Sequence, residues 1–289
     1  MKPLDKHKRP KPRFHTAEEQ DRKEGKSDVG SRFDSMVHAE QLYGLIPVLE
    51  ALRAGHRPID NITIAEGAKH DRLRELLDLA RKANVPIHRV PRVSLNRSLN
   101  DATHQGVVAR IAAARYEDAD DLIDRLSTKV GTDSPPLALV LDGIEDPRNL
   151  GAIVRTAECA GVDGIFVPER RAVGLTGAVM KAAAGAIEYV PVARVTNLVR
   201  LIEQLKERNI WTVGAASEGK SDYTEWDWTL PTAIFLGNEG SGLHRLVKER
   251  CDTLVRIPVR GRLDSLNVSV AAGVLLYEAL RRRGNRESD

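Results

Sequence analysis

Polar side chains and glycines gather in two loops near the carboxyl end of the chain, and each loop follows a short apolar run. The first loop, NEGSGL (238–243), places Glu239 among glycines after the run TAIFLG. The second, GRLDSLN (261–267), contains Ser265 and Asn267 and leads into the small apolar residues of VSVAAGVLLYEAL. Glycines let a ligand approach the backbone closely, and such loops at the carboxyl ends of parallel strands form small-molecule clefts. We therefore expect a ligand cleft within residues 232–280.

Two further polar residues, Asn149 and Arg155, lie in the segment NLGAIVRTA. Asn149 lies near the start of an expected helix, where an amide commonly caps the helix or occupies its first turn. Arg155 lies inside the same, otherwise apolar helix, and an arginine there needs a partner or a cavity. A salt bridge to Glu158 and a position facing the cleft both satisfy that need. Ser265 and Asn267 also allow two interpretations. Either could cap the last helix, and both could line the mouth of the cleft.

One further loop matches a phosphate-binding pattern without its structural context. GAASEGKS (214–221) fits G-x-x-x-x-G-K-S and follows an apolar run. Such a loop holds phosphates only where a helix begins at its Lys-Ser. The next residues, DYTEWDW, have no helical apolar period and carry three acids. We therefore favour a surface turn here over the site of a nucleotide hydrolase.

Composition indicates a globular chain. Its 289 residues are 42% hydrophobic and 29% charged, with a net charge of +3. No apolar run approaches the ~18 residues of a membrane-spanning helix, and the charged N-terminus lacks the apolar core of a secretory signal. Cys159 and Cys251 have no metal-type spacing, and no metal cluster is evident elsewhere. A reduced, cytoplasmic protein without a membrane partner is the simplest expectation.

The chain before the cleft domain divides into three parts. Residues 1–37 are polar and predict a disordered tail. Six Lys or Arg against one acid in its first thirteen residues suit either nucleic-acid contact or mere solubility. Residues 38–115 alternate helix-like and strand-like segments, which predicts a small α/β domain. Residues 116–136 are acidic and then polar and end in SPP, which predicts a linker containing a short helix.

The small domain should contain two amphipathic helices. They are LIPVLEALRAG, ended by Gly55, and DRLRELLDLARKAN, ended at Asn84. Strands are expected at NITIAEG, VPIHRV and GVVARIAA. The later half of this domain carries the basic residues Arg89, Arg92, Arg97 and Arg110, with His88 and His104. Such a face would suit nucleic-acid phosphates, although an ordinary solvated surface has the same composition.

From Leu137 onward the pattern is that of a parallel sheet covered by helices. LALVLD is apolar up to its closing acid, as is typical of a strand buried on both faces. Helix-like and strand-like segments then alternate to the last helix, so we expect a second α/β domain over residues 137–284. The carboxyl ends of its strands should bring the loop after LALVLD to the two polar loops.

Three motifs together resemble the SPOUT superfamily of RNA methyltransferases, and within it the TrmH-type ribose 2′-O-methyltransferases. They are NLGAIVRTA (149–157), FLGNEGSGL (235–243) and IPVRGRLDSLNVSVAAG (257–273). In the small domain, YGLIPVLEAL and HQGVVAR are similar to the RNA-binding domain of bacterial enzymes that methylate a guanosine ribose in 23S rRNA. The resemblance covers nearly everything except the tail.

The resemblance implies methyl transfer from S-adenosylmethionine to a ribose 2′-hydroxyl of RNA, most specifically a guanosine in 23S rRNA or the large-subunit precursor. It also implies a C-terminal trefoil knot and a homodimer whose site is completed near the subunit interface. No metal is implied. By motif position, the catalytic and positioning residues are Asn149, Arg155, Glu239, Ser265 and Asn267. By the same carry-over, backbone at three positions binds the donor: Gly237, Ile257 and Leu266.

In this family the counterpart of Arg155 is assigned the activation of the hydroxyl. A guanidinium is almost always protonated, so we expect Arg155 to position the hydroxyl or a neighbouring phosphate and to stabilise developing negative charge. Methylation of tRNA ribose is the alternative within the family. A nucleotide hydrolase at residues 214–221 and a non-catalytic RNA-binding protein are the alternatives from other classes.

Overall fold

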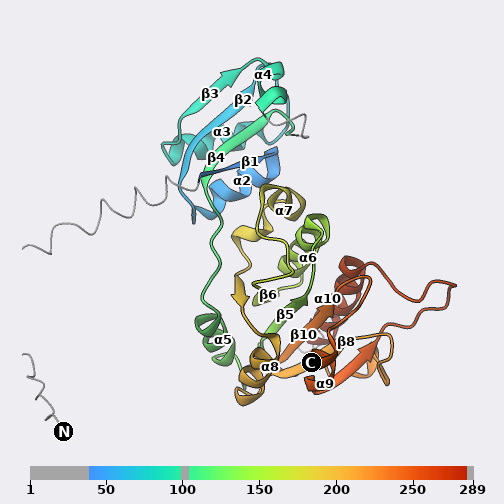
Figure 1. Ribbon diagram of the computed structural model, residues 1–289. Coiled ribbons are helices and arrows are strands. Elements are labelled where there is room, and N and C mark those ends of the chain that lie inside the picture. The colour runs from blue at the N-terminus through green and yellow to red at the C-terminus, as the bar shows by residue number, and fades with distance from the viewer. Residues whose placement is uncertain (1–38, 99–103, 285–289) are drawn as a thin grey trace, which may run out of the picture. The chain divides into compact units, whose positions relative to one another are not determined.

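The computed structural model describes residues 39–98 and 104–284 (Figure 1). The tail predicted at residues 1–37 lies outside the described residues. A four-stranded sheet occupies the first part and a seven-stranded sheet the second. Every strand pairing in the larger sheet is parallel. The predicted parallel α/β domain, preceded by a small α/β domain, is thereby confirmed.

The small sheet has the strand order β1-β4-β2-β3. β4 runs antiparallel to β1 and β2, and β3 runs parallel to β2. Leu49 of helix α2 and Leu76 of helix α3 share a buried core with Ile62 and Ile111 of the sheet. The elements are β1 (Ala39–Tyr43), α2 (Leu45–Ala54), β2 (Ile59–Ala65), α3 (Leu73–Lys82), β3 (Ile87–Val90), α4 (Arg92–Ser98) and β4 (Val107–Ala112).

The predicted helix ends are found where the backbone turns left-handed. Gly55 has φ +65°, and Asn84, just beyond α3, has φ +55°. Both residue types accept this conformation more readily than others do. β1 and α4 were not predicted, because AEQLY is only five residues long and RVSLNRS is short and largely polar.

His104 is not part of a basic face, contrary to the expectation. It is buried, and its ring contacts Asn96 Oδ1 through Nε2 (2.8 Å) and the Gly106 backbone N–H through Nδ1 (3.0 Å). Burial lowers the pKa of His104, because the charged imidazolium is poorly solvated there. It therefore orders the start of β4.

The segment expected as a linker belongs partly to the core of the larger domain. Its helix is α5 (Ala119–Ser127), capped by the Asp118 carboxylate. Leu122, Ile123 and Leu126 of α5 are buried in one core cluster with residues of β6 and α8. The Glu117 backbone N–H also donates to the Val192 carbonyl oxygen (2.9 Å) at the sheet edge. Residues 117–127 are thus anchored to the sheet.

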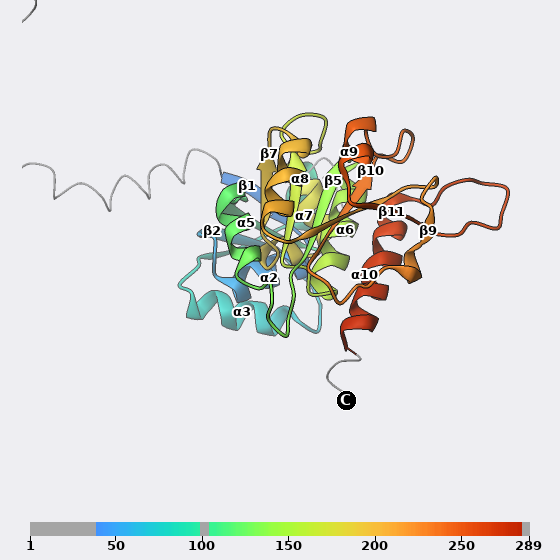
Figure 2. The ribbon, with the colours of Figure 1, turned by 90° about the horizontal axis from the view of Figure 1, so that it is seen from below.

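The large sheet has the order β7-β6-β5-β10-β8-β11-β9 and is covered on both faces (Figure 2). Leu139 and Leu141 of β5 pack into a core with α6, α7 and α10. Ala138 and Val140, which point to the other face, pack with α5, α8 and α9. No helix in the described ranges is long and apolar enough to cross a membrane.

The strands of this sheet are β5 (Leu137–Asp142), β6 (Gly164–Pro168), β7 (Val192–Val195), β8 (Trp211–Ala215), β9 (Ser221–Asp222), β10 (Thr232–Gly237) and β11 (Thr253–Arg256). Its helices are α6 (Pro147–Cys159), α7 (Gly177–Ala183), α8 (Leu198–Glu207), α9 (Arg245–Arg250) and α10 (Val268–Gly284). The short helix α9 was not predicted.

Candidate active site

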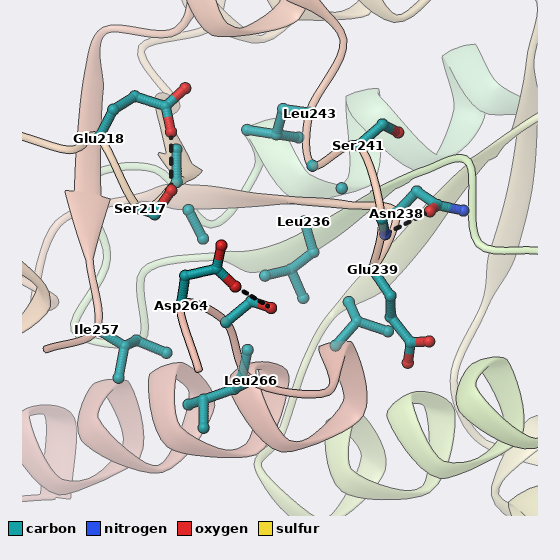
Figure 3. A pocket seen from close by; sticks show the side chains of 18 of the residues that line it. Ser217, Glu218, Leu236, Asn238, Glu239, Ser241, Leu243, Ile257, Asp264 and Leu266 are labelled. Carbon is teal, nitrogen blue, oxygen red and sulfur yellow. Dashed lines mark hydrogen bonds between the residues drawn. The ribbon is translucent and has the colours of Figure 1, made fainter. Parts of the chain in front are cut away.

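Three loops meet around one pocket of about 280 Å³ (Figure 3). They follow β8, β10 and β11, which are adjacent parallel strands, so their carboxyl ends lie at one edge of the sheet. The pocket is lined by residues 215–218, residues 236–243, Lys248 and part of 257–271. These residues include the glycine loop that was predicted to form a cleft. The pocket therefore lies where the two polar loops were expected to form one.

All three predicted donor-binding positions line this pocket: Gly237, Ile257 and Leu266. A Cβ at Gly237 would lie 2.1 Å from the Gly242 carbonyl carbon and from the Leu243 nitrogen, so the loop folds back directly onto this residue. Leu236 and Val268 add apolar walls beside the exposed backbone of the glycine loop. Apolar walls with a few backbone polar groups suit a nucleoside-bearing donor.

Asn149, Glu239 and Asn267 form a hydrogen-bonded network at the side of the pocket. The Nδ2 atoms of both asparagines donate to Glu239 Oε1 at 2.5 Å. Asn267 Nδ2 also donates to Asn149 Oδ1 at 3.2 Å. The three side chains come from the first turn of α6, the loop after β10 and the start of α10. The structure thus brings together three of the five predicted catalytic residues.

The capping question has a different answer for each asparagine. Asp146 caps α6 through the Arg148 backbone N–H (2.7 Å), which leaves Asn149 available to Glu239. Asn267 does both: its Oδ1 accepts from the Ser269 backbone N–H (3.0 Å), while its Nδ2 joins the network. An amide carries an acceptor and a donor, so capping orients the donor toward Glu239.

Ser265 lines the pocket and does not cap α10. Its hydroxyl donates to Asp264 Oδ1 at 3.4 Å, and Asp264 also lines the pocket. Glu218 and Lys248 form an ion pair at the lining, Nζ to Oε1 2.5 Å. The hydrogen bond from Lys248 lowers the pKa of Glu218. Sequence reasoning missed Asp264, Glu218 and Lys248 as site residues, although Asp264 lies inside one of the three motifs.

Arg155 is a predicted catalytic residue that neither lines the pocket nor joins the network around Glu239. It is exposed on α6 and absent from the pocket lining. Six helical residues after Asn149 amount to about 240° of rotation, so the two side chains leave α6 on different sides. Within the described ranges it makes no salt bridge to Glu158 either. Its neighbour Thr156 lies near α10: a Cβ at Gly273 would be 3.9 Å from Thr156 Cγ2.

A second set of hydrogen bonds joins the carboxyl end of β5 to the chain segment that follows β10. Asp142, buried at the end of β5, accepts from the His244 backbone N–H (2.8 Å) and contacts its Nδ1 (2.7 Å). Asn238 Nδ2 donates to the Gly143 carbonyl oxygen (2.8 Å), and Asn238 Oδ1 accepts from the Gly240 N–H (2.8 Å). These bonds hold the loop that carries Glu239. An acid ending an apolar strand was the available signal for Asp142.

The phosphate-loop match has no helix behind it. Lys220 is followed by the two-residue strand β9 and a 3-10 turn at Tyr223–Glu225. A Cβ at Gly219 would lie 2.6 Å from the Val255 carbonyl carbon, so this loop packs tightly against β11. The geometry of a phosphate-binding loop is absent at residues 214–221, in agreement with the prediction of a turn.

Two family models match the chain. A model of the SpoU rRNA Methylase family matches residues 136–277, and one described as RNA 2′-O ribose methyltransferase substrate binding matches residues 41–117. A protein named as a TrmH family tRNA/rRNA methyltransferase in Bacillus subtilis is 44% identical over 244 residues, which are 84% of this chain and 96% of the relative. A Staphylococcus aureus protein of the same family name is 43% identical over 242 residues, with coverage of 84% and 96%.

Solved structures agree. The SpoU methyltransferase AviRb of Streptomyces viridochromogenes, in complex with the cofactor AdoMet, matches with a TM-score of 0.70 and 25% identity over 86% of this chain and 92% of AviRb. An AdoMet-bound rRNA methyltransferase of Sinorhizobium meliloti matches with a TM-score of 0.69 and 25% identity, covering 87% and 90%. The chain therefore belongs to the SpoU/TrmH family of RNA methyltransferases, which use S-adenosylmethionine as the methyl donor.

Proposed function

We propose that this enzyme methylates the ribose 2′-hydroxyl of a guanosine in 23S rRNA, acting on the large-subunit precursor. The observation that carries the ribose assignment is the match of residues 41–117 to the model described as RNA 2′-O ribose methyltransferase substrate binding. The network in which Asn149 and Asn267 hold Glu239 beside the pocket supplies a group that can accept from a hydroxyl. Support for the ribosomal acceptor comes from residues 136–277, which match the model of the SpoU rRNA Methylase family. Methylation of tRNA is the competing acceptor within the same chemistry.

Donor and hydroxyl would be held by different parts of the site. When bound, the donor supplies a methyl group on a positively charged sulfur. Backbone at Gly237, Ile257 and Leu266 holds the donor at the pocket. Glu239 is oriented by two amides and so accepts the hydrogen bond of the incoming hydroxyl, which raises the nucleophilicity of its oxygen. Ser265 lines the same pocket and orients the ribose from the other side.

Arg155 would act from a second subunit. α10 exposes three large apolar side chains on one side of the helix: Val270 (52%), Tyr277 (51%) and Leu280 (39%). Residues spaced by seven and three share a helix face, and an exposed apolar face of this kind marks a contact with another protein. Thr156, the neighbour of Arg155, lies near Gly273, which is on the same side of α10 as Val270 and Tyr277. A two-fold dimer built on this side would therefore bring the arginine of one subunit toward the other subunit's pocket.

The dimer and the role of Arg155 can be tested in one experiment. Arg155→Ala and Glu239→Gln subunits are co-expressed with different tags, and mixed dimers are purified. Recovery of methyl transfer in mixed dimers is expected, because each contains one site with both residues intact. No recovery would mean that both residues act within one subunit. Tyr277→Glu should give a monomer by light scattering.

The acceptor is tested with purified protein, radiolabelled S-adenosylmethionine and two transcripts, 23S rRNA and tRNA. Label is expected in 23S rRNA at one guanosine, in an alkali-resistant dinucleotide, because a 2′-O-methyl group blocks backbone hydrolysis. Label only in tRNA would overturn the ribosomal assignment, and label on a base would overturn the ribose assignment. Lys220→Ala serves as control. It should retain full methyl transfer, whereas ATP turnover lost in this variant would favour a hydrolase.

The proposal also includes a cytoplasmic location and the trefoil knot of the family. The match of residues 136–277 to the SpoU family model supports the knot, because the knot is a feature that the family resemblance implies. An experimental structure that traces 257–284 relative to 236–243 tests the knot. Co-sedimentation of tagged protein with precursors of the large ribosomal subunit tests the location.

A further inference from the structure

The described residues that line the donor pocket carry more negative than positive charge. The carboxylates are Glu218, Glu239 and Asp264, and the one basic side chain among these residues is Lys248. Lys248 is engaged with Glu218, and Figure 3 shows Glu218 and Glu239 on opposite sides of the pocket. The charges of Glu239 and Asp264 are therefore not balanced by a lysine or arginine of the lining.

The immediate partners of these two carboxylates are neutral. Glu239 accepts from the amides of Asn149 and Asn267. Asp264 accepts from the Ser265 hydroxyl, and neither carboxylate forms an ion pair within the described ranges. Neutral donors orient a carboxylate without cancelling its charge, so both keep a long-range attraction for a cation.

The donor and its product differ in charge. S-adenosylmethionine carries a sulfonium, an ammonium and a carboxylate, which sum to a single positive charge. Transfer of the methyl group leaves a neutral thioether, so S-adenosylhomocysteine has no net charge. The shape of the two molecules is otherwise nearly the same. A pocket with unbalanced carboxylates therefore separates them by electrostatics rather than by fit.

We propose that Asp264 makes the pocket select the charged donor over the neutral product. Asp264 is suited to this task because it lines the pocket two residues before the predicted donor-binding Leu266 and takes no part in the network around Glu239. Loss of the sulfonium charge on transfer then weakens binding and favours product release. The inference rests on the family's methyl donor and holds for either RNA acceptor.

The expected size follows from Coulomb attraction at a site open to water. Opposite unit charges several ångströms apart at intermediate dielectric change a binding constant by about three- to tenfold. The effect should fall with added salt, because an exposed carboxylate is screened.

The test is titration calorimetry on the full chain with S-adenosylmethionine, S-adenosylhomocysteine and sinefungin, which carries an amine in place of the methylsulfonium. Asp264→Asn should weaken the two cationic ligands by about three- to tenfold and the neutral product less than twofold. Asp264→Glu should keep the preference. Asp133→Asn, an exposed acid outside the pocket lining, should change nothing.

Equal weakening of donor and product would mean that Asp264 acts as a hydrogen-bond or structural group, and the proposal would fail. It would also fail if Asp264→Asn left all three affinities unchanged. Absence of donor binding by the unaltered protein would instead contradict the methyltransferase assignment itself. Melting temperatures of the variants, measured without ligand, separate loss of folding from loss of discrimination.

Discussion

Gly237→Ala should disrupt the donor pocket although it adds only a methyl group. The new Cβ would lie 2.1 Å from the Gly242 carbonyl carbon and the Leu243 nitrogen and 2.3 Å from the Gly242 carbonyl oxygen. All three atoms belong to the backbone, so no side chain can rotate away. Ordinary contact begins near 3.4 Å, so the two loop segments must separate by about 1 Å.

That displacement occurs inside the glycine loop that lines the pocket. Overpacking of this kind costs about 1–3 kcal/mol of folding stability. For a chain of this size, that corresponds to a fall in melting temperature of about 2–12 °C. Because Gly237 and residues 238–243 line the pocket, donor affinity should fall by at least about tenfold, or ~1.4 kcal/mol.

Gly240→Ala is the matched control. A Cβ at Gly240 has Asn238 Oδ1 as its nearest neighbour at 3.6 Å, which is an ordinary contact, and its φ is not positive. Calorimetric titration with S-adenosylmethionine and thermal unfolding are measured for both variants. Gly240→Ala should stay within about twofold of the unaltered affinity. If Gly237→Ala bound the donor with unaltered affinity and melting temperature, the tight return of the loop onto Gly237 would be refuted.

Three further outcomes are expected. Arg283→Ala should cost about 2 kcal/mol in denaturant unfolding, because its guanidinium donates to four backbone carbonyl oxygens, those of Pro135, Pro136, Trp228 and Leu230. Arg281→Ala, an exposed control, should cost less than about 1 kcal/mol. Burial raises the pKa of Glu40, so the folded state binds more protons than the unfolded state and stability falls as the pH rises. Glu40→Gln should therefore be more stable than the unaltered protein at pH 7, and melting curves should show that this gain vanishes below about pH 4. A stability difference between the two proteins that stayed the same from pH 7 to about pH 4 would contradict the prediction. Arg155→Ala should keep donor affinity and lose methyl transfer, and full turnover would remove its assigned role.

Most elements could be predicted because their signals are local. LALVLD is apolar up to its last residue, Asp142, and forms the fully buried β5. Gly55 ends α2 because the left-handed conformation there favours glycine. The elements that were not predicted include β1, α4 and α9. They have five to seven residues each, too few to show a clear hydrophobic period. α5 was expected, but its burial against β6 and α8 depends on which surface the sheet leaves uncovered.

The candidate site was likewise predicted in its residues but not in its contacts. The motifs identified Asn149, Glu239 and Asn267, yet capping explained the asparagines equally well at that stage. The folded chain shows that Asn267 caps α10 and bonds Glu239 with different atoms of one amide. It also shows that Arg155 is exposed on α6 and does not line the pocket. The six helical residues between Asn149 and Arg155 account for that separation, because they turn the side chain by about 240°.

The sequence alone therefore determined the residue types, the glycine turns and the family, all of which depend on short stretches of chain. The tertiary structure decided which polar groups meet. The bonds of the network join residues 90, 28 and 118 positions apart. Contacts at such separations depend on the order β5-β10-β8-β11 in the sheet and on the position of α10 against α6. No local pattern encodes that order, because it follows from how the whole set of apolar faces is buried at once.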